Sequence, residues 1–329
     1  MFRIRTPSRI HLTLIDLWGG LGRVDGGVGI SLQNPHFVLE ARKIRRGIRV
    51  QGPFRDEIMV AAKKVLAKKM VKKGVDFRVL ECYEKHVGLG SGTQAALSAG
   101  MAVNKLYKVN LSVREIARTV GRGGTSGIGV AAFESGGFIL DGGHMFGPDE
   151  EKSQFLPSRA SKAGPPPILL RHDFPTRWAI VMALPSIMRG ASGIGEIDIF
   201  SKLCPIDKED VQKLCHIILM QLLPAMMEND IERFGEAINE IQQTGFNKIY
   251  GIEQQHPIIG KLIRVIGNSG AAGSGMSSFG PVTFGFVDEK SVDPKTVRKA
   301  AQSLLNKTTG GKTWITRARN QGAEIERVR

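Results

Sequence analysis

Apolar and polar positions along the chain divide it into recognisable elements. Residues 2–15 alternate loosely between apolar and polar, which predicts a strand, and a glycine-rich turn at 19–22 before apolar residues 28–32 predicts a hairpin. Apolar residues recur with helical spacing over 56–73 and again over 93–107. A strand is predicted at 77–82, so a glycine-rich segment lies between a strand and a helix.

The rest of the chain continues as a mixture of helices and strands. Ser112 and Glu115 have capping-box spacing at the start of a short helix that ends near residue 120. Further strands are predicted at 137–140, 178–184, 282–287 and 313–316. Two helices are predicted within 208–246, and single helices at 258–266 and 294–306.

Proline content predicts where the chain divides. Four prolines fall within residues 157–167, where they fit neither a helix nor a central strand. A length of 329 residues suits two domains. We therefore expect two α+β lobes, residues 1–167 and 168–329, with the active site in the cleft between them.

Composition narrows the class of protein. There is no run of eighteen apolar residues and no secretory leader pattern, which predicts a soluble, cytoplasmic protein without a membrane segment. Cys82, Cys204 and Cys215 form no Cys-x-x-Cys pair and have no histidine at zinc-ligand spacing. We expect all three to be reduced core residues.

The formal net charge of +15 favours anionic partners. Nucleic acid is the less favoured partner, because the chain has few aromatic residues and no recognisable reading helix. Small phosphorylated metabolites are favoured instead. A non-catalytic nucleic-acid-binding protein remains an alternative, and steeply salt-dependent binding at physiological ionic strength would support it.

The glycine-rich segment before the helix at 93–107 has the features of a phosphate site. Glycines 88, 90 and 92 let the backbone turn tightly and point N–H groups inward, and the helix adds its positive dipole end. Ser91 and Thr93 can donate further hydrogen bonds. No Gly-Lys-Ser/Thr follows, so this is not a Walker loop. A turn that serves only helix packing is the alternative.

Gly88-Leu-Gly90-Ser91-Gly92 resembles the second signature of the superfamily of galactokinase, homoserine kinase, mevalonate kinase and phosphomevalonate kinase. Residues 7–12, Pro-Ser-Arg-Ile-His-Leu, resemble its first signature, and residues 270–276 resemble its third. The resemblance implies a two-lobed, small-molecule-kinase-like α+β fold.

One position departs from that superfamily. Residues 125–129 resemble the region where many of these kinases carry Ser-Gly-x-Asp, but Gly129 occupies the acidic position. Because glycine cannot act as a base, the departure weakens the kinase interpretation. An ATP-dependent small-molecule kinase remains an alternative.

A closer resemblance lies in residues 8–17 followed by 21–29, and also in residues 190–200 and 221–224. These segments resemble the archaeal β-ribofuranosylaminobenzene 5′-phosphate synthase family. That family has the kinase fold but joins phosphoribosyl diphosphate to 4-aminobenzoate or 4-hydroxybenzoate, releasing carbon dioxide and diphosphate on the way to methanopterin. The resemblance implies a homodimer and no use of ATP, and either acid fits the sequence.

Such a reaction requires that two anionic substrates be positioned, that departing diphosphate be stabilised and that water be excluded. On this interpretation Gly88, Gly90, Ser91, Gly92 and Thr93 hold phosphate groups. Ser274 and Gly275, in the third glycine segment, are expected to assist them.

Charged residues near the N terminus are the candidates for catalysis. Arg9 and Arg23 are expected to bind a substrate carboxylate or phosphate. Asp16 and Asp25 are expected to hold Mg²⁺ on the diphosphate or to steady developing positive charge. His11 is expected to donate to a substrate or a leaving oxygen. The alternatives are a turn at Asp25, a core role for His11 and a structural salt bridge at Arg9.

Overall fold

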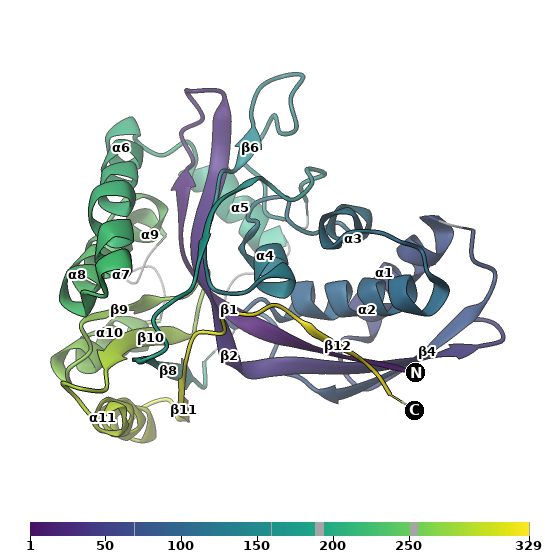
Figure 1. Ribbon diagram of the computed structural model, residues 1–329. Coiled ribbons are helices and arrows are strands. Elements are labelled where there is room, and N and C mark those ends of the chain that lie inside the picture. The colour runs from purple at the N-terminus through teal and green to yellow at the C-terminus, as the bar shows by residue number, and fades with distance from the viewer. Residues whose placement is uncertain (69, 159, 188–193, 251–255, 329) are drawn as a thin grey trace.

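The computed structural model describes the chain apart from residues 69, 159, 188–193, 251–255 and 329, and omits the side chains of 194–196. The family-like segment at 190–193 therefore lies outside the described residues. The chain forms two β-sheets with helices packed against both, as Figure 1 shows. The predicted α+β class is confirmed.

The first sheet is built on the long antiparallel pair β1 and β2. Its strands are β1 (Phe2–Asp16), β2 (Arg23–Ile44), β3 (Ile48–Gln51), β4 (Gly74–Glu81), β5 (Phe138–Asp141), β6 (His144–Met145), β7 (Ile168–His172) and β12 (Glu324–Arg327). Helices of this region are α1 (Arg55–Lys68), α2 (Ser91–Tyr107), α3 (Val113–Val120) and α4 (Ile128–Glu134). In Figure 1 they lie above the lower parts of β1 and β2.

Local sequence explains several of these elements. Ile58, Val65 and Leu66 are buried on one side of α1, as its apolar spacing predicts. At the start of α3, the backbone N–H of Glu115 donates to Ser112 and the Glu115 carboxylate accepts from the Ser112 N–H. The capping-box prediction is confirmed.

The second sheet has the order β11-β8-β10-β9. Its strands are β8 (Trp178–Pro185), β9 (Gly273–Met276), β10 (Thr283–Asp288) and β11 (Gly311–Thr316). The helical elements are α5 (Ile194–Leu203), α6 (Lys208–Ile217), the π-helix η1 (Ile218–Leu222), α7 (Leu223–Glu228), α8 (Ile231–Gln242), α9 (Gly245–Ile249), α10 (Ile258–Asn268) and α11 (Pro294–Asn306). The region predicted as two helices is thus divided into five helical segments.

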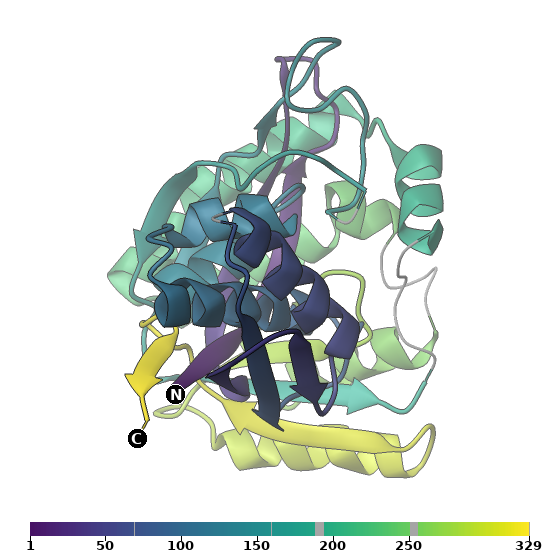
Figure 2. The ribbon, with the colours of Figure 1, turned by 90° about the vertical axis from the view of Figure 1, so that its right-hand side faces the viewer.

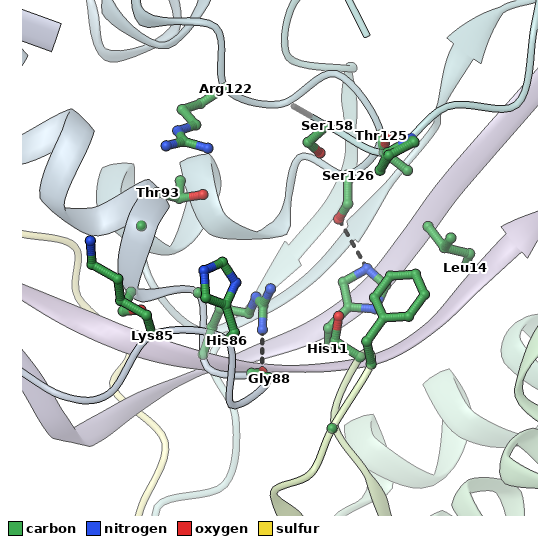
Figure 3. Close-up of a pocket in the computed structure, with 18 of the residues that line it drawn as sticks. His11, Leu14, Lys85, His86, Gly88, Thr93, Arg122, Thr125, Ser126 and Ser158 are labelled. Atoms are coloured by element: carbon green, nitrogen blue, oxygen red, sulfur yellow. Dashed lines mark hydrogen bonds between the residues drawn. The ribbon is translucent and has the colours of Figure 1, made fainter. Parts of the chain in front are cut away.

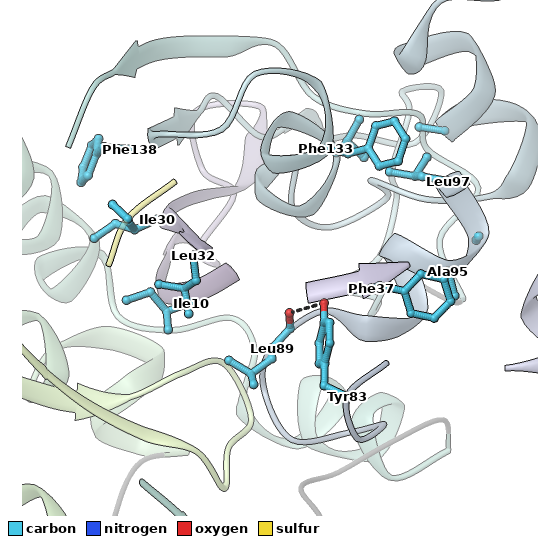
Figure 4. Packing of buried hydrophobic residues seen from close by; sticks show 14 of the residues in the cluster. Ile10, Ile30, Leu32, Phe37, Tyr83, Leu89, Ala95, Leu97, Phe133 and Phe138 are labelled. Atoms are coloured by element: carbon cyan, nitrogen blue, oxygen red, sulfur yellow. Dashed lines mark hydrogen bonds between the residues drawn. The ribbon is translucent and has the colours of Figure 1, made fainter. Parts of the chain in front are cut away.

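The core holds the glycine-rich segment in place. Figure 4 shows Leu89 packed near Ile10 and Leu32, and Ala95 beside Phe37. The Tyr83 hydroxyl donates to the Leu89 carbonyl oxygen at 3.3 Å. The residues on both sides of the glycines are therefore anchored in the apolar interior, which fixes the loop relative to β1.

The two sheets do not separate at residue 167. Strand β7 follows that residue but pairs with β5, and β12 brings the C-terminal segment back to pair with β1. Accordingly, the two chain ends lie near each other in Figures 1 and 2. The division into residues 1–167 and 168–329 stays a prediction about domains.

The structure can be compared with two further expectations from composition, on the cysteines and on membrane segments. The three cysteines are free thiols, but Cys82 and Cys215 are exposed, so their prediction as core residues is wrong. None of the helices in the described part of the chain combines the length and the apolar character that crossing a bilayer requires.

Candidate active site

A pocket opens where β1, the glycine-rich loop and the turn after β9 meet. Residues from both halves of the chain line it, and Figure 3 shows side chains converging on it from several loops. It has a cationic end beside the glycine-rich loop and an aromatic end beside α5 and α9.

The glycine-rich loop has positive backbone φ angles, which residues with a side chain rarely adopt. Gly88 has φ +87°, and a Cβ there would lie 2.3 Å from the carbonyl oxygen of Ser277. Gly90 has φ +79° and caps α2 without a side chain. An anion at this point would therefore complete the first turn of α2.

Two side chains hold the loop through one carbonyl. Arg9 donates from Nη1 to the Gly88 oxygen at 2.5 Å, and the Ser277 hydroxyl donates to the same oxygen at 2.7 Å. Ser91 donates to the carbonyl of Glu84 at 3.1 Å, so its hydroxyl also serves the loop. Arg9 thus positions the phosphate loop in addition to lining the pocket.

Among the described lining residues, the cationic end contains three arginine or lysine side chains, Arg9, Lys85 and Arg122, against one carboxylate, Glu57. Lys85 contacts both oxygens of Glu57 at 2.8 Å. Burial lowers the pKa of Arg9 to about 10, with Tyr83 opposing the shift, so the guanidinium stays charged at neutral pH. This end of the pocket suits an anionic ligand.

The aromatic end is formed by Phe200 of α5, Phe246 of α9 and Phe279 of the turn after β9, with Leu14 of β1. The rings of Phe200 and Phe246 stack at 5.5 Å, and Phe246 meets Phe279 edge to face at 5.8 Å. Such rings provide an apolar surface on which a planar aromatic ligand can pack.

His11 lies between the two ends on β1, after Arg9 and before Leu14. Its Nε2 is 3.1 Å from the hydroxyl of Ser126, the contact drawn in Figure 3. Burial, and secondarily the charge of Arg9, lower the pKa of His11 to about 3. The imidazole is therefore neutral at physiological pH.

The structure brings together most of the residues predicted from the sequence. Those that line the pocket are Arg9, His11, Gly88, Gly90, Ser91, Gly92 and Thr93. Asp16, Arg23, Asp25, Ser274 and Gly275 are not among the lining residues.

Asp25 is fully buried in an ion cluster. Its carboxylate is 2.8 Å from Nζ of Lys152 and 2.6 Å from Nδ1 of His144, and all three side chains are at most 2% exposed. The other ring nitrogen of His144, Nε2, is 2.8 Å from the carbonyl oxygen of Gly164. Because its oxygens are already paired, Asp25 does not offer a carboxylate to a ligand in the pocket.

Asp16 and Arg23 also have structural partners. Asp16 accepts from the backbone N–H groups of Trp18 and Gly19 and so stabilises the turn after β1. Arg23 donates from Nε to the carbonyl of Gly142 at 2.5 Å. Neither contact points to a substrate role. In the described residues, no cluster of three or more histidine, cysteine or acidic side chains has metal-site geometry.

Within the third glycine segment, residues 273–276 form the buried strand β9 rather than a loop. Ser274 donates its hydroxyl to the Ile263 carbonyl at 3.1 Å, and a Cβ at Gly275 would meet the side chain of Gln242. These contacts place both residues in the packing of β9. Instead, Ser278, Phe279 and Gly280 in the following turn line the pocket.

Several lining residues were not predicted as site residues from the sequence, notably Lys85, Arg122, Ser126, Phe246 and Phe279. Arg122 and Ser126 fall in the glycine-dense stretch at 121–129, which was a usable signal. The two phenylalanines carried no local signal, because only the fold brings α9 and the turn after β9 to the pocket.

Gly129 is closely packed. A Cβ there would lie 3.2 Å from Cγ2 of Thr93, and its carbonyl accepts from Nε2 of Gln94 at 2.8 Å. The position therefore brings α4 against the first turn of α2 and supplies no acidic group to the pocket.

The fold and the glycine-loop pocket define a protein of the GHMP kinase class. Models described as GHMP kinases N terminal domain and GHMP kinases C terminal match residues 57–137 and 222–306. A crystal structure of homoserine kinase from Cytophaga hutchinsonii has a TM-score of 0.72 and 14% identity, covering 99% of this chain and 97% of that one.

Sequence comparison identifies the family within this class. A β-ribofuranosylphenol 5′-phosphate synthase of Methanothermobacter thermautotrophicus is 46% identical, covering 97% of each chain. A protein of the same name from Archaeoglobus fulgidus is 44% identical, covering 99% of this chain and 100% of its own. The chain belongs to the β-ribofuranosylphenol 5′-phosphate synthase family, which confirms the closer of the two resemblances found in the sequence.

Proposed function

We propose that the protein condenses phosphoribosyl diphosphate with 4-hydroxybenzoate to give β-ribofuranosylphenol 5′-phosphate, carbon dioxide and diphosphate in methanopterin biosynthesis. The full-length similarity to synthases of that name supports the product. A phenol results when the acid carries a hydroxyl group, which favours 4-hydroxybenzoate over 4-aminobenzoate.

The observation that carries the proposal is the pocket's two unlike ends. Arg9, Lys85, Arg122 and the start of α2 suit the phosphates of a phosphoribosyl donor, and the phenylalanines of the other end suit a benzoate ring. If both substrates bind in this pocket, the ribosyl carbon and the ring carbon lie next to each other. Proximity of this kind supplies a large part of a two-substrate acceleration.

The chemistry proceeds without ATP. The bond between ribosyl C1 and diphosphate breaks, and its electron pair leaves with diphosphate. The ring carbon that bears the carboxylate forms a bond to C1, and the electron pair of the bond to the carboxylate then returns to the ring as carbon dioxide departs. The basic end stabilises the leaving group, and the apolar end keeps water from the reactive sugar.

We propose that Mg²⁺ enters with the diphosphate. This ion is commonly bound by substrate phosphates with one or two carboxylates from the protein. Glu57 is the one carboxylate among the described lining residues, and Lys85 contacts both of its oxygens. The expected ligands Asp16 and Asp25 do not line the pocket. When bound, the ion would neutralise charge on the leaving diphosphate.

The direct test follows labelled carbon dioxide from carboxyl-labelled 4-hydroxybenzoate, and diphosphate, with Mg²⁺ and phosphoribosyl diphosphate present and ATP omitted. Release of both products supports the synthase. Consumption of ATP with a small alcohol, and no carbon dioxide from either benzoate, supports the kinase instead. Faster turnover of 4-aminobenzoate would overturn the choice of acid.

A matched pair of variants ties the activity to this pocket. Thr93 lines it, whereas Thr119 lies in α3 and donates to the carbonyl of Glu115 at 2.7 Å. Both changes to valine remove one hydroxyl from a helical threonine. We expect Thr93→Val to raise the KM for phosphoribosyl diphosphate and Thr119→Val to leave it unchanged.

A further inference from the structure

Ser126 connects His11 of the pocket to a buried carboxylate. The Ser126 hydroxyl oxygen is 3.1 Å from Nε2 of His11, 3.3 Å from Oδ2 of Asp141 and 3.3 Å from the backbone nitrogen of Ile128. Asp141 is completely buried at the end of β5. The three side chains therefore form a chain of hydrogen bonds from the interior to the pocket wall.

Counting donors and acceptors assigns the proton of His11. A serine hydroxyl has one proton and two acceptor positions. The Ile128 N–H takes one acceptor position, and the carboxylate of Asp141 takes the proton. The remaining acceptor position of Ser126 requires an N–H, so Nε2 of His11 carries the proton and Nδ1 carries a lone pair.

Asp141 is itself arranged to act as an acceptor. Its Oδ2 accepts from the backbone N–H of Gly127 at 2.8 Å, and its Oδ1 accepts from that of Gly143 at 3.1 Å. Both backbone donors hold the carboxylate in a fixed position. The Ser126 hydroxyl is thereby directed to Asp141 instead of to His11.

The position of His11 suits the Nε2–H tautomer to the proposed reaction. Along β1, Arg9 contacts the glycine-rich loop and Leu14 packs with the aromatic end, so His11 lies at the junction of the two. In the proposed reaction, ribosyl C1 becomes positively charged at that junction. A neutral ring with an unprotonated nitrogen stabilises such a charge, whereas an N–H pointing at it does not.

We propose that His11 is a catalytic residue that presents the lone pair of Nδ1 to the developing positive charge, and that Ser126 and Asp141 are positioning residues that fix this tautomer. The inference rests on the proposed function for the reacting atoms, but the tautomer itself does not. No proton is transferred in this role. His11 was expected from the sequence to act as a donor, and the hydrogen-bond count makes its Nδ1 an acceptor.

The relay also predicts a pH dependence. Burial raises the pKa of Asp141 to about 7, with backbone N–H donors opposing the shift. A protonated Asp141 would donate to Ser126, whose own proton would then turn to Nε2 of His11. The ring proton would move to Nδ1, and the lone pair of that nitrogen would be lost.

Other charges around Asp141 act on the same equilibrium. Asp25 on β2 raises its pKa further, and His144 on β6 lowers it. Strand β7 pairs with β5 and places Arg171 and His172 opposite earlier residues of that strand. Because these groups stay in place when Ser126 is changed, a Ser126 variant isolates the relay from the charges.

The test combines nitrogen NMR of the His11 ring with steady-state kinetics. In the resting wild-type protein at pH 8 we expect the Nε2–H tautomer, with conversion toward Nδ1–H as the pH falls through about 7. Ser126→Ala should mix the tautomers and lower kcat by about 10- to 100-fold with little change in KM. Ser126→Thr, which keeps the hydroxyl, should restore both.

Ser135 provides a control for the Ser126 variants. Ser135→Ala removes a hydroxyl that donates to the Ala131 carbonyl at the end of α4, and we expect no effect on tautomer or kcat. An Nδ1–H tautomer in the wild type at pH 8, or an unchanged tautomer and kcat in Ser126→Ala, would overturn the relay. The NMR measurement needs no substrate, so it distinguishes failure of the relay from failure of the proposed function.

Discussion

Arg9 and Gly88 are joined by a hydrogen bond of 2.5 Å from the guanidinium to the carbonyl oxygen, across 79 positions of sequence. The bond couples the first strand to the glycine-rich loop. Ser277 donates to the same oxygen from the other half of the chain. The shape of the loop therefore depends on three segments that meet at one carbonyl.

Replacing Gly88 by alanine should disable the loop. The positive φ costs about 1 kcal/mol for a residue with a side chain, and the new Cβ would also meet the Ser277 carbonyl. We expect kcat/KM for phosphoribosyl diphosphate to fall by about 100-fold. Gly121→Ala is the control, because Gly121 has φ +76° at the exposed end of α3 and lies outside the pocket. Equal losses of activity in both variants would contradict this account.

Arg9 and Ser277 should show strong energetic coupling. Arg9→Met is expected to raise the KM for phosphoribosyl diphosphate by roughly 10- to 100-fold, since a charge-assisted bond is lost. Ser277→Ala should have a smaller effect. Because both donate to the Gly88 carbonyl, a double-mutant cycle on kcat/KM should be non-additive by about 1 kcal/mol or more. Additive effects would show that the two contacts act independently.

The aromatic end should govern affinity for the acid alone. Phe279→Ala is expected to raise the KM for 4-hydroxybenzoate by roughly tenfold, from lost ring packing, and to leave that for phosphoribosyl diphosphate unchanged. Phe155→Ala is the control: Phe155 packs on the same apolar cluster but does not line the pocket. A shift in both KM values with Phe279→Ala would place the ring contact elsewhere.

Asp25 should prove to be a stability residue. Asp25→Asn leaves the buried Lys152 ammonium without its counter-charge, and we expect a loss of about 3–5 kcal/mol in unfolding free energy. Adding Lys152→Met should recover part of that loss, as measured by urea unfolding. The Mg²⁺ concentration for half-maximal activity should not change. If it rises while stability stays intact, Asp25 holds the metal.

Short-range patterns in the sequence predicted the fold well. The Ser112 capping box and the apolar spacing of α1 depend on residues within a few turns, so the sequence contains the whole signal. Strand β12 was not predicted, because its four residues acquire their pairing from β1 at the opposite end of the chain. Non-local pairing of this kind leaves little local pattern.

The site was partly predictable for the same reason. Glycines 88 and 90 indicate a backbone with positive φ angles, and both residues have positive φ in the structure. Asp25 resembled a catalytic acid in its glycine-rich context, but its partner Lys152 lies 127 positions away. A sequence shows that a carboxylate is present and not whether a distant cation has already paired with it.

The bond that joins the two substrates provides the most direct test of the proposed synthase activity. Phosphoribosyl diphosphate labelled with ¹³C at ribosyl C1 and 4-hydroxybenzoate labelled at the carboxylate-bearing ring carbon would be incubated with Mg²⁺ and no ATP. We expect a product whose two labels show one-bond carbon–carbon coupling. A product in which ribosyl C1 is bonded to oxygen, or no product under conditions where the protein phosphorylates an alcohol with ATP, would contradict it.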